Sequence, residues 1–363
     1  MKSSIALAAA AVAAAFFSLD SGLAGAQSAP PARSVTIDPD GTARLQNATI
    51  PLSSMLSAES KQILRNIQPS EGPRSAPQTK TEDMAELRRK MNEGLQPRVK
   101  HSIDLFKVDV EEATIDGISV AIVTPKGGVP ERNKNRLMIN APGGGFRTGI
   151  RANGLLISIP VSAAGQFKVI SLLYRQGPEH KFPAATEDFT KVYKAMLKTY
   201  KPANIGFVGC SAGGALIAQM VAHLINTGMP RPGVLGVYCA GLSSKFEDGD
   251  SVVFTELATG NPRGQVPGRS YFEGVNLDDP LVTPANNLAL LAKFPPTLFA
   301  VATRDFSMSA AAYSYRRLLK AGIESDLLIY DGLGHGFMTN PDYPESRDLY
   351  EIAARFYDKH LGR

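Results

Sequence analysis

The chain has 363 residues, 44% of them hydrophobic and 20% charged, a composition typical of globular proteins and unlike that of disordered, collagen-like or coiled-coil chains. Its mean hydropathy of −0.08 excludes a protein built from many membrane spans. The net charge of +5 is small for this length, and the one dense basic run, Arg88–Lys90, is typical of a solvated helix face. We therefore expect no nucleic-acid partner.

The first 26 residues have the three-part pattern of a secretory signal peptide. Lys2 supplies a basic head, the apolar run Ile5–Phe17 is too short to span a bilayer, and Ala24–Ala26 offers a small-x-small cleavage site. A buried Ala-rich helix is the alternative. We expect residues 1–26 to be removed and the protein to be periplasmic or extracellular, without a stable membrane anchor, because no cysteine near the cleavage site could carry a lipid.

The region that follows is predicted to be irregular at first and then helical. Residues 27–44 are rich in Pro and Ser, which predicts a loose N-terminal arm. Apolar residues at mostly helical spacing predict a helix over Ser53–Ile67. Thr79 and Glu82 form a capping-box pattern, which predicts a second helix that ends at Gly94.

From about residue 101 the pattern changes to short apolar strands that mostly alternate with amphipathic helices. Strands are predicted at residues 103–110, 118–124, 137–140, 168–174, 205–209, 234–239, 296–302 and 327–330. Helices are predicted at residues 186–198, 212–226, 308–320 and 344–360. This alternation predicts an α/β fold with a mostly parallel eight-stranded sheet covered by helices on both faces, interrupted by a polar, Gly-rich insertion at 241–274.

A serine lies in a Gly-rich turn between a predicted strand and a predicted helix. Gly209–Gly213 reads Gly-Cys-Ser-Ala-Gly, the G-x-S-x-G pattern in its required setting. Small flanking residues allow a sharp turn that exposes the Ser211 hydroxyl at the helix N-terminus, where the Ala212 amide faces a developing oxyanion. A purely structural Gly/Ser turn is the alternative.

A serine nucleophile needs a base, and the base needs an acid to orient it. In α/β-hydrolases these partners follow in the order Ser, Asp or Glu, His, each after a later strand. Asp305 comes just after one late strand, and His335 lies in a Gly-rich loop after the last strand. Order, spacing and strand context together predict a triad of Ser211, Asp305 and His335.

Consecutive glycines follow the strand at 137–140. The segment Asn140–Phe146 reads Asn-Ala-Pro-Gly-Gly-Gly-Phe, and such a loop leaves backbone amides free to point at a substrate oxygen. A phosphate-binding loop is the competing interpretation. It fails because neither Gly-Lys-Ser/Thr nor G-x-G-x-x-G is matched.

These motifs, in this order, resemble the hormone-sensitive-lipase-like (GDXG-type) α/β-hydrolases. The resemblance covers about residues 103–360, and it is carried by five segments: Pro142–Phe146, Tyr174–Ala185, Gly209–Gly214, Asp279–Pro284 and Gly334–Phe337.

The resemblance implies an α/β-hydrolase catalytic domain at 101–363 and a helical cap formed by residues 45–100 and an insertion at about 241–275. It also implies Ser211 as nucleophile, His335 as base, Asp305 as orienting acid, and the amides of Gly144, Gly145 and Ala212 as the oxyanion hole.

Two positions depart from the family pattern. Pro142 stands where the family begins its glycine run with His, and Cys210 stands where it has Asp before the serine. We expect altered loop support and pocket lining rather than lost activity. Cys210 as the nucleophile is the alternative, but Ser211 occupies the elbow position.

Only two cysteines occur, Cys210 and Cys239, and both lie in apolar strand-like segments. That count excludes a disulfide framework and a four-cysteine zinc site. A single bridge is conceivable in an oxidising compartment, but we favour two buried reduced thiols. The five histidines show no metal-ligand spacing, so we expect no metal and no cofactor.

The sequence thus predicts a secreted serine carboxylesterase that cleaves small or medium acyl esters through an acyl-enzyme. A lactone substrate, opened by the same steps, is the runner-up. A non-catalytic ligand-binding protein on the same fold is the alternative from another class. The sequence leaves the oligomeric state open, and a homodimer is one of the possibilities.

Overall fold

The computed structural model describes residues 34–39, 42–46, 49–66, 83–244, 249–259 and 270–362, so the predicted signal peptide lies outside the described residues. The chain divides into two compact units, residues 1–50 and 51–363. In the first unit, β1 (Ser34–Ile37) pairs antiparallel with β2 (Ala43–Gln46). The 27–44 segment, expected to be a loose arm, therefore contains the first strand of a hairpin and the start of the second.

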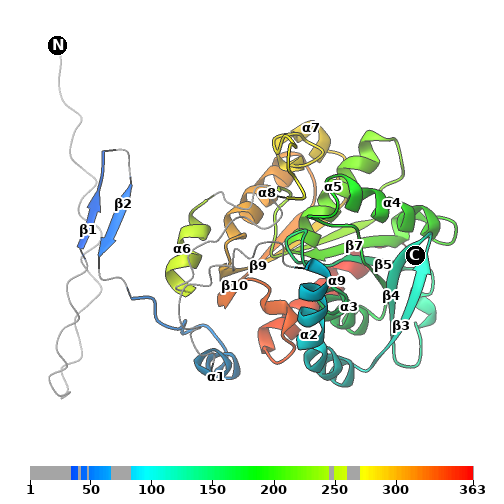
Figure 1. Ribbon diagram of the computed structural model, residues 1–363, viewed down its shortest axis with the longest axis horizontal. Helices are drawn as coiled ribbons and strands as arrows, with labels where there is room; N and C mark the ends of the chain where they lie inside the picture. Colours follow the sequence, from blue (N-terminus) through cyan, green and yellow to red (C-terminus); the bar gives the residue numbers. More distant parts are fainter. Residues whose placement is uncertain are drawn as a thin grey trace, which may run out of the picture. The chain divides into compact units, whose positions relative to one another are not determined.

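The second unit is organised around an eight-stranded sheet in the order β10-β9-β8-β7-β5-β6-β4-β3 (Figure 1). β4 runs antiparallel to its neighbours β3 and β6, and all other neighbours are parallel. The strands are β3 (Val108–Ile115), β4 (Ile118–Pro125), β5 (Leu137–Ala141), β6 (Lys168–Leu172), β7 (Ile205–Cys210), β8 (Val234–Tyr238), β9 (Thr297–Arg304) and β10 (Ser325–Gly334). The predicted mostly parallel eight-stranded sheet is confirmed.

Helices cover both faces of the sheet, as predicted (Figure 1). The α-helices of this unit are α1 (Ala58–Asn66), α2 (Met84–Phe106), α3 (Arg151–Gly165), α4 (Ala184–Met196), α5 (Ala212–Asn226), α6 (Asp250–Thr259), α7 (Leu288–Leu291), α8 (Met308–Lys320) and α9 (Pro344–His360). The short 3-10 helices are η1 (Glu131–Asn133), η2 (Pro202–Asn204), η3 (Pro284–Asn286) and η4 (Phe337–Thr339).

Two buried apolar clusters lie against the sheet and hold these layers together. One is built with α4, α5 and α8, and the other with α3 and α9. β5, β7 and β8 are buried along their whole lengths, since helices cover both of their faces. The carboxyl ends of the parallel strands therefore form one edge of a rigid platform, which is the edge where ligands bind in open α/β sheets.

The N-terminal helices differ from the prediction at their ends. α2 begins after Asp83, whose carboxylate accepts hydrogen bonds from the Ala85 and Glu86 amides, whereas the predicted capping residues Thr79 and Glu82 lie outside the described residues. Gly94 does not end the helix. α2 continues to Phe106 because its packing on α3 outweighs the low helix propensity of one glycine.

Two smaller differences follow from the same helices. Residues 103–106, predicted as strand, form the last turn of α2, and the strand begins at Val108. α1 starts at Ala58, five residues after the predicted start. Within the described residues, no helix is both long and apolar enough to cross a membrane.

The segment of α1 is tied to the sheet domain by polar contacts. The Ser57 amide and the Ser60 hydroxyl donate to the Glu345 carboxylate at 2.8 and 2.5 Å, and Glu345 lies in the first turn of α9. Asn92 of α2 accepts a hydrogen bond from the Ala152 amide at 3.0 Å, in the first turn of α3. These contacts make α1 and α2 part of the same unit as the sheet rather than a separate module.

Candidate active site

Ser211 occupies the sharp turn between β7 and α5. Its backbone has a φ of +56° and a ψ of −124°, a conformation that is costly for a non-glycine residue, and its amide donates to the Tyr238 carbonyl at 2.9 Å. At Gly213, an added Cβ would come within 1.9 Å of the Ala141 carbonyl oxygen. The first turn of α5 can therefore lie against the end of β5 only with glycine at this position.

Asp305 and His335 meet Ser211 at the same edge of the sheet. Each directly follows a strand, Asp305 after β9 and His335 after β10. The His335 Nε2 atom lies 2.9 Å from the Ser211 Oγ atom, and the His335 Nδ1 atom lies 2.8 Å from the Asp305 Oδ1 atom. The three residues predicted from the sequence are thus joined in one hydrogen-bonded relay that runs from a buried carboxylate to an accessible hydroxyl.

Two residues that the sequence analysis missed support this relay. The Ser307 amide and hydroxyl donate to the Asp305 Oδ1 atom at 2.8 and 2.7 Å. The Phe306 ring stacks on the His335 ring, with centroids 4.2 Å apart and an interplanar angle of 25°. A serine two residues after an acidic residue, just before a helix, was the available signal for the first contact. The stacking had no local signal because His335 comes from a different strand.

The glycine loop, residues 143–145, lies against Ser211. A Cβ built on Gly143 would be 3.4 Å from the Ser211 Cβ atom, and Gly144 has a φ of +126°, a conformation that side chains rarely adopt. Within the described residues, the structure gives no hydrogen-bond acceptor for the amides of Gly144, Gly145 and Ala212.

Two buried polar side chains hold this loop in place. The Tyr174 hydroxyl donates to the Pro142 carbonyl at 2.7 Å, and burial raises the pKa of Tyr174, which keeps this donor protonated. The Gln176 amide pairs with both backbone groups of Gly149, accepting at 2.7 Å and donating at 2.8 Å. The position that lacks the family's histidine is therefore supported through its own carbonyl.

Arg88 of α2 fastens the outer side of the same loop. Its guanidinium forms a bidentate pair with Glu179, at 2.7 and 2.8 Å, and also donates to the Arg147 and Gly177 carbonyls, each at 2.8 Å. Hydrogen bonding to Arg88 lowers the pKa of Glu179. The N-terminal helix thus contacts the loop directly, although the sequence gives no indication of this pairing.

Cys210 and Cys239 form a disulfide, so the expectation of two reduced thiols is wrong. They lie at the ends of the neighbouring parallel strands β7 and β8, which brings their Cα atoms to 5.4 Å, within the usual range for a disulfide. The prediction that both cysteines are buried in apolar segments is confirmed. Whether they are bonded depends on the strand order, which spacing alone does not determine.

One cluster near the site has the residue types of a metal centre. Single ligand atoms of Cys239, Asp305 and His335 lie within 4.8 Å of one another. The Cys239 sulfur is bonded to Cys210, whereas a cysteine must be a free thiolate to bind a metal ion. The carboxylate and the imidazole are already paired in the relay. The cluster is therefore explained by the triad and the disulfide.

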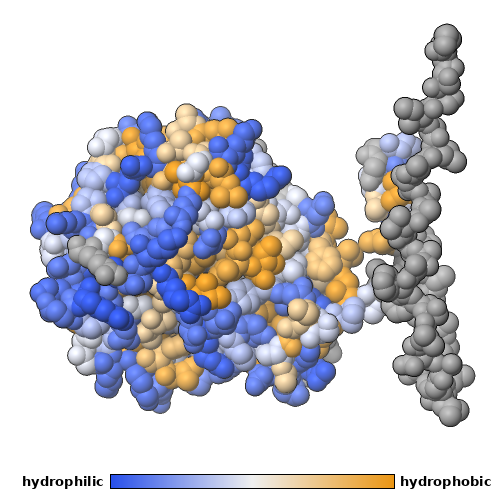
Figure 2. Space-filling model, turned by 180° about the vertical axis from the view of Figure 1, so that it is seen from behind, coloured by the Kyte–Doolittle hydropathy of each residue, from blue (hydrophilic) through white to orange (hydrophobic). Residues whose placement is uncertain are grey.

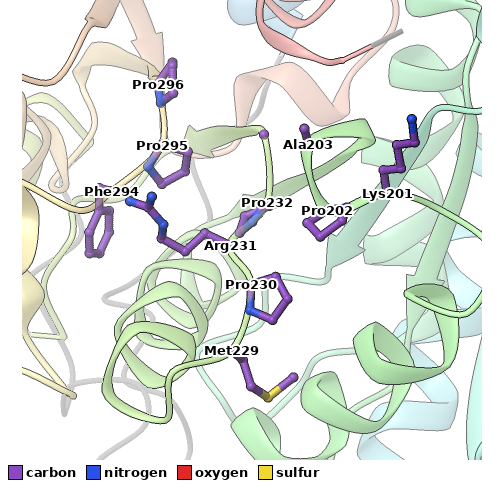
Figure 3. Close-up of a pocket in the computed structure, with 11 residues that line it drawn as sticks. Lys201, Pro202, Ala203, Met229, Pro230, Arg231, Pro232, Phe294, Pro295 and Pro296 are labelled. Carbon is purple, nitrogen blue, oxygen red and sulfur yellow. The ribbon is translucent and has the colours of Figure 1, made fainter.

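A pocket of about 670 Å³ lies at the opposite edge of the sheet, at the amino ends of β7, β8 and β9 (Figure 3). It is lined by residues 201–203, 229–233 and 294–296, five of which are prolines. In Figure 3 the Arg231 side chain extends toward Pro295 while Lys201 points away from it. Arg231 donates to the Lys293 carbonyl. Among the residues that line this pocket, no two polar side chains converge as Asp305, His335 and Ser211 do at the opposite edge.

Helix α6, in the insertion predicted at about 241–275, brings apolar surface next to the loop that carries Asp305 and Phe306. The Ser251 hydroxyl donates to the Phe306 carbonyl at 2.7 Å, which ties the start of α6 to the residue after Asp305. Val253 and Leu257 of α6 are more than half exposed. On the face of the molecule shown in Figure 2, apolar patches lie between hydrophilic ones.

Comparison with known proteins agrees with this geometry. Residues 138–339 match the model of a family described by its alpha/beta hydrolase fold. The chain belongs to that α/β-hydrolase family. The motifs described above place it with the hormone-sensitive-lipase-like esterases, and this α/β-hydrolase is a carboxylic ester hydrolase.

Individual relatives support the same assignment. The α/β-hydrolase is 26% identical over 256 residues to an acetyl-hydrolase of Streptomyces hygroscopicus, covering 68% of this chain and 83% of that one. It is 28% identical over 267 residues to a versiconal hemiacetal acetate esterase of Dothistroma septosporum, covering 67% and 78%. The crystal structure of an esterase named E25 superposes with a TM-score of 0.76 at 27% identity, covering 88% of this chain and 99% of that one.

Proposed function

We propose that this ester hydrolase works through a covalent acyl-enzyme on Ser211, with His335 as general base and Asp305 as the orienting acid. The observation that carries the proposal is the continuous relay from the Asp305 Oδ1 atom through both nitrogens of His335 to the Ser211 Oγ atom, with contacts of 2.8 and 2.9 Å. A hydroxyl, an imidazole and a buried carboxylate in this order are the requirements for activating a serine.

In the first half-reaction, the Ser211 Oγ atom attacks the ester carbonyl while the His335 Nε2 atom takes the hydroxyl proton. The negative charge that develops on the carbonyl oxygen is stabilised by the amides of Gly144, Gly145 and Ala212, which are held ready by the loop geometry. The N-terminal end of α5 adds its positive dipole at the same point. The alcohol then leaves with the proton that His335 holds, and the acyl group stays on Ser211.

In the second half-reaction, His335 removes a proton from a water molecule, which attacks the acyl-enzyme. The tetrahedral intermediate collapses, Ser211 recovers its proton from His335, and the carboxylic acid is released. Asp305 fixes the ring orientation in both halves and stabilises the transient imidazolium. Its complete burial strengthens that interaction.

We propose esters with small or medium acyl groups as substrates. The glycine loop lies directly over the nucleophile, and the apolar surface of α6 lies next to the acid loop. Two relatives carry acetyl or acetate in their names, which supports the short end of this range.

The test is a substrate panel with a matched pair of variants. Wild type should hydrolyse p-nitrophenyl acetate and butyrate faster than long-chain esters, and Ser211→Ala should lose at least about 10⁴-fold in kcat. Ser309→Ala, which removes a nearby hydroxyl outside the relay, serves as the control. A lactone in the panel distinguishes the two ester classes. Equal activity in wild type and Ser211→Ala would contradict the mechanism.

We also propose that the protein is exported and loses residues 1–26. The signal-like N-terminus supports this, and so does the disulfide, since disulfides persist mainly in oxidising compartments. Mass spectrometry of protein recovered from the periplasm or medium should show a chain that begins at Gln27. Recovery of the uncleaved chain from the cytoplasm only would contradict export.

A further inference from the structure

We propose that the Cys210–Cys239 disulfide is a positioning element of the triad, which fixes Ser211 relative to Asp305 and His335. The inference rests on the proposed function, because it assigns a role to the surroundings of the same three residues. The disulfide bond joins the residue just before the nucleophile to the residue just after β8.

The bridge fastens the nucleophile turn at a strained point. Ser211 has a φ of +56° and Cys239 a φ of +41°, so both sides of the bridge carry left-handed backbone. Such conformations persist only where the surroundings over-determine them. The two segments are also joined by the pairing of β7 with β8, which ends at Cys210 and Tyr238, and by the 2.9 Å hydrogen bond from the Ser211 amide to the Tyr238 carbonyl. Covalent and hydrogen bonds together hold the turn at the end of β8.

The disulfide also lies close to the other two residues of the relay. The Cys239 sulfur is part of the group in which it, an Asp305 oxygen and a His335 nitrogen lie within 4.8 Å of one another. The Met338 sulfur lies 3.9 Å from the Cys210 sulfur and 3.7 Å from the Cys239 sulfur. Met338 is buried and follows His335 by three residues, in η4. The disulfide therefore packs against the base loop as well as the nucleophile turn.

The Asp305 carboxylate is hydrogen-bonded through one of its two oxygens. The Asp305 Oδ1 atom accepts three hydrogen bonds, from His335 and from both donors of Ser307. The Oδ2 atom is buried and has no hydrogen-bond partner within the described residues. We infer that the disulfide, whose Cys239 sulfur lies within 4.8 Å of an Asp305 oxygen, helps to limit the movement of this carboxylate.

Loss of the bridge should therefore lower kcat more than it changes KM. Misplacement of reacting groups by about 1 Å can cost on the order of 100-fold in rate. We expect Cys210→Ala/Cys239→Ala to lose about 10- to 100-fold in kcat, with KM within about threefold of wild type, when assayed well below its Tm. Cys210→Val/Cys239→Ala, which leaves less empty volume near Met338, is the second variant if the first folds poorly.

The first measurement is a thiol count on denatured, unreduced wild type. Because the chain has only two cysteines, the bridge predicts no free thiol, and two free thiols would overturn the proposal. The second is a kinetic comparison of the double variant with Val192→Ala. This control creates a cavity at α4, and we expect it to lower Tm without changing the triad. A kcat loss in the double variant but not in Val192→Ala supports positioning.

Two results would overturn the inference while leaving the proposed function intact. One is a kcat of the bridge-free enzyme within about twofold of wild type. The other is a loss of kcat in Val192→Ala equal to that of the double cysteine variant when the two variants have the same Tm. Failure of the proposed function looks different, since wild type itself would then not react with a fluorophosphonate at Ser211.

Discussion

The two edges of the central sheet carry similar chemical groups but differ in how these groups are satisfied. At the carboxyl edge, the buried Asp305 is bonded to an exposed His335, which is bonded to the hydroxyl of Ser211. At the amino edge, Arg136 directly precedes β5 and is equally buried. Its guanidinium is bonded to Asn133, to Asp358 and to the Leu361 and Gly362 carbonyls.

Arg136 bonds only to groups that belong to the fold, Asn133 and residues 358–362 near the C-terminal end, so its charge contributes to stability. Asp305 bonds to Ser307 and to His335, and through His335 the relay reaches the accessible hydroxyl of Ser211. Under the proposed mechanism, this difference is what makes the carboxyl edge reactive. The amino edge also has the pocket of about 670 Å³, but volume without convergent polar groups carries no reaction.

The largest expected effect is at the carboxyl edge. His335→Ala removes the base, and Asp305→Asn leaves the His335 ring without the carboxylate that orients it. Each should lower kcat by about 10³- to 10⁴-fold or more, with little change in Tm for His335→Ala. Steady-state kinetics with p-nitrophenyl butyrate checks this. A loss below tenfold in either variant would remove that residue from the mechanism.

The next effect is at the amino edge and on stability alone. Arg136→Met leaves the Leu361 and Gly362 carbonyls without their buried donor, which costs about 1–3 kcal/mol, while the half-exposed Asp358 carboxylate can be solvated. Chemical denaturation should show this loss. The kcat of the folded fraction should equal that of wild type, and a tenfold lower kcat would break the contrast between the two edges.

A smaller effect is expected just behind the triad. Ser307→Ala removes one of the two Ser307 hydrogen bonds to the Asp305 Oδ1 atom and should lower kcat by about tenfold, since hydrogen bonds to charged groups are worth roughly 1.5–3 kcal/mol. Ser309→Ala, two residues on, is the matched control, because the Ser309 hydroxyl accepts from the Ser251 amide instead. Equal kcat in both variants would mean that the Ser307 hydroxyl does not orient the acid.

The smallest effect is expected in the amino-edge pocket. Arg231→Ala removes the contact with the Lys293 carbonyl and opens the pocket, yet kcat and KM for every ester in the panel should stay within about twofold of wild type. A tenfold change in either constant would show that the pocket communicates with the reaction.

Much of the site was predictable because its residues lie at strand ends. Ser211, Asp305 and His335 each directly follow a strand, and parallel strands bring their carboxyl ends to one edge, so local patterns were enough to unite them. The helices at 212–226, 308–320 and 344–360 were predicted with their observed bounds, since each has one apolar face or a clear start signal.

The rest depended on contacts that no local pattern encodes. α3 was missed because it is apolar around most of its circumference and contains Gly154 and Pro160, so it has no helical period to detect. α2 passes through Gly94 and Pro97 because of its packing on α3. Predicting the disulfide requires the information that β7 and β8 are neighbours. Because the two strands are parallel, their carboxyl ends then lie side by side.

The mass of the protein after incubation with diethyl p-nitrophenyl phosphate tests the proposed nucleophile most sharply. We expect one diethylphosphoryl group per chain, located on the peptide that contains Ser211 and absent from Ser211→Ala, with ester hydrolysis lost in proportion. Continued hydrolysis by an unmodified chain, or a modified residue other than Ser211, would contradict it.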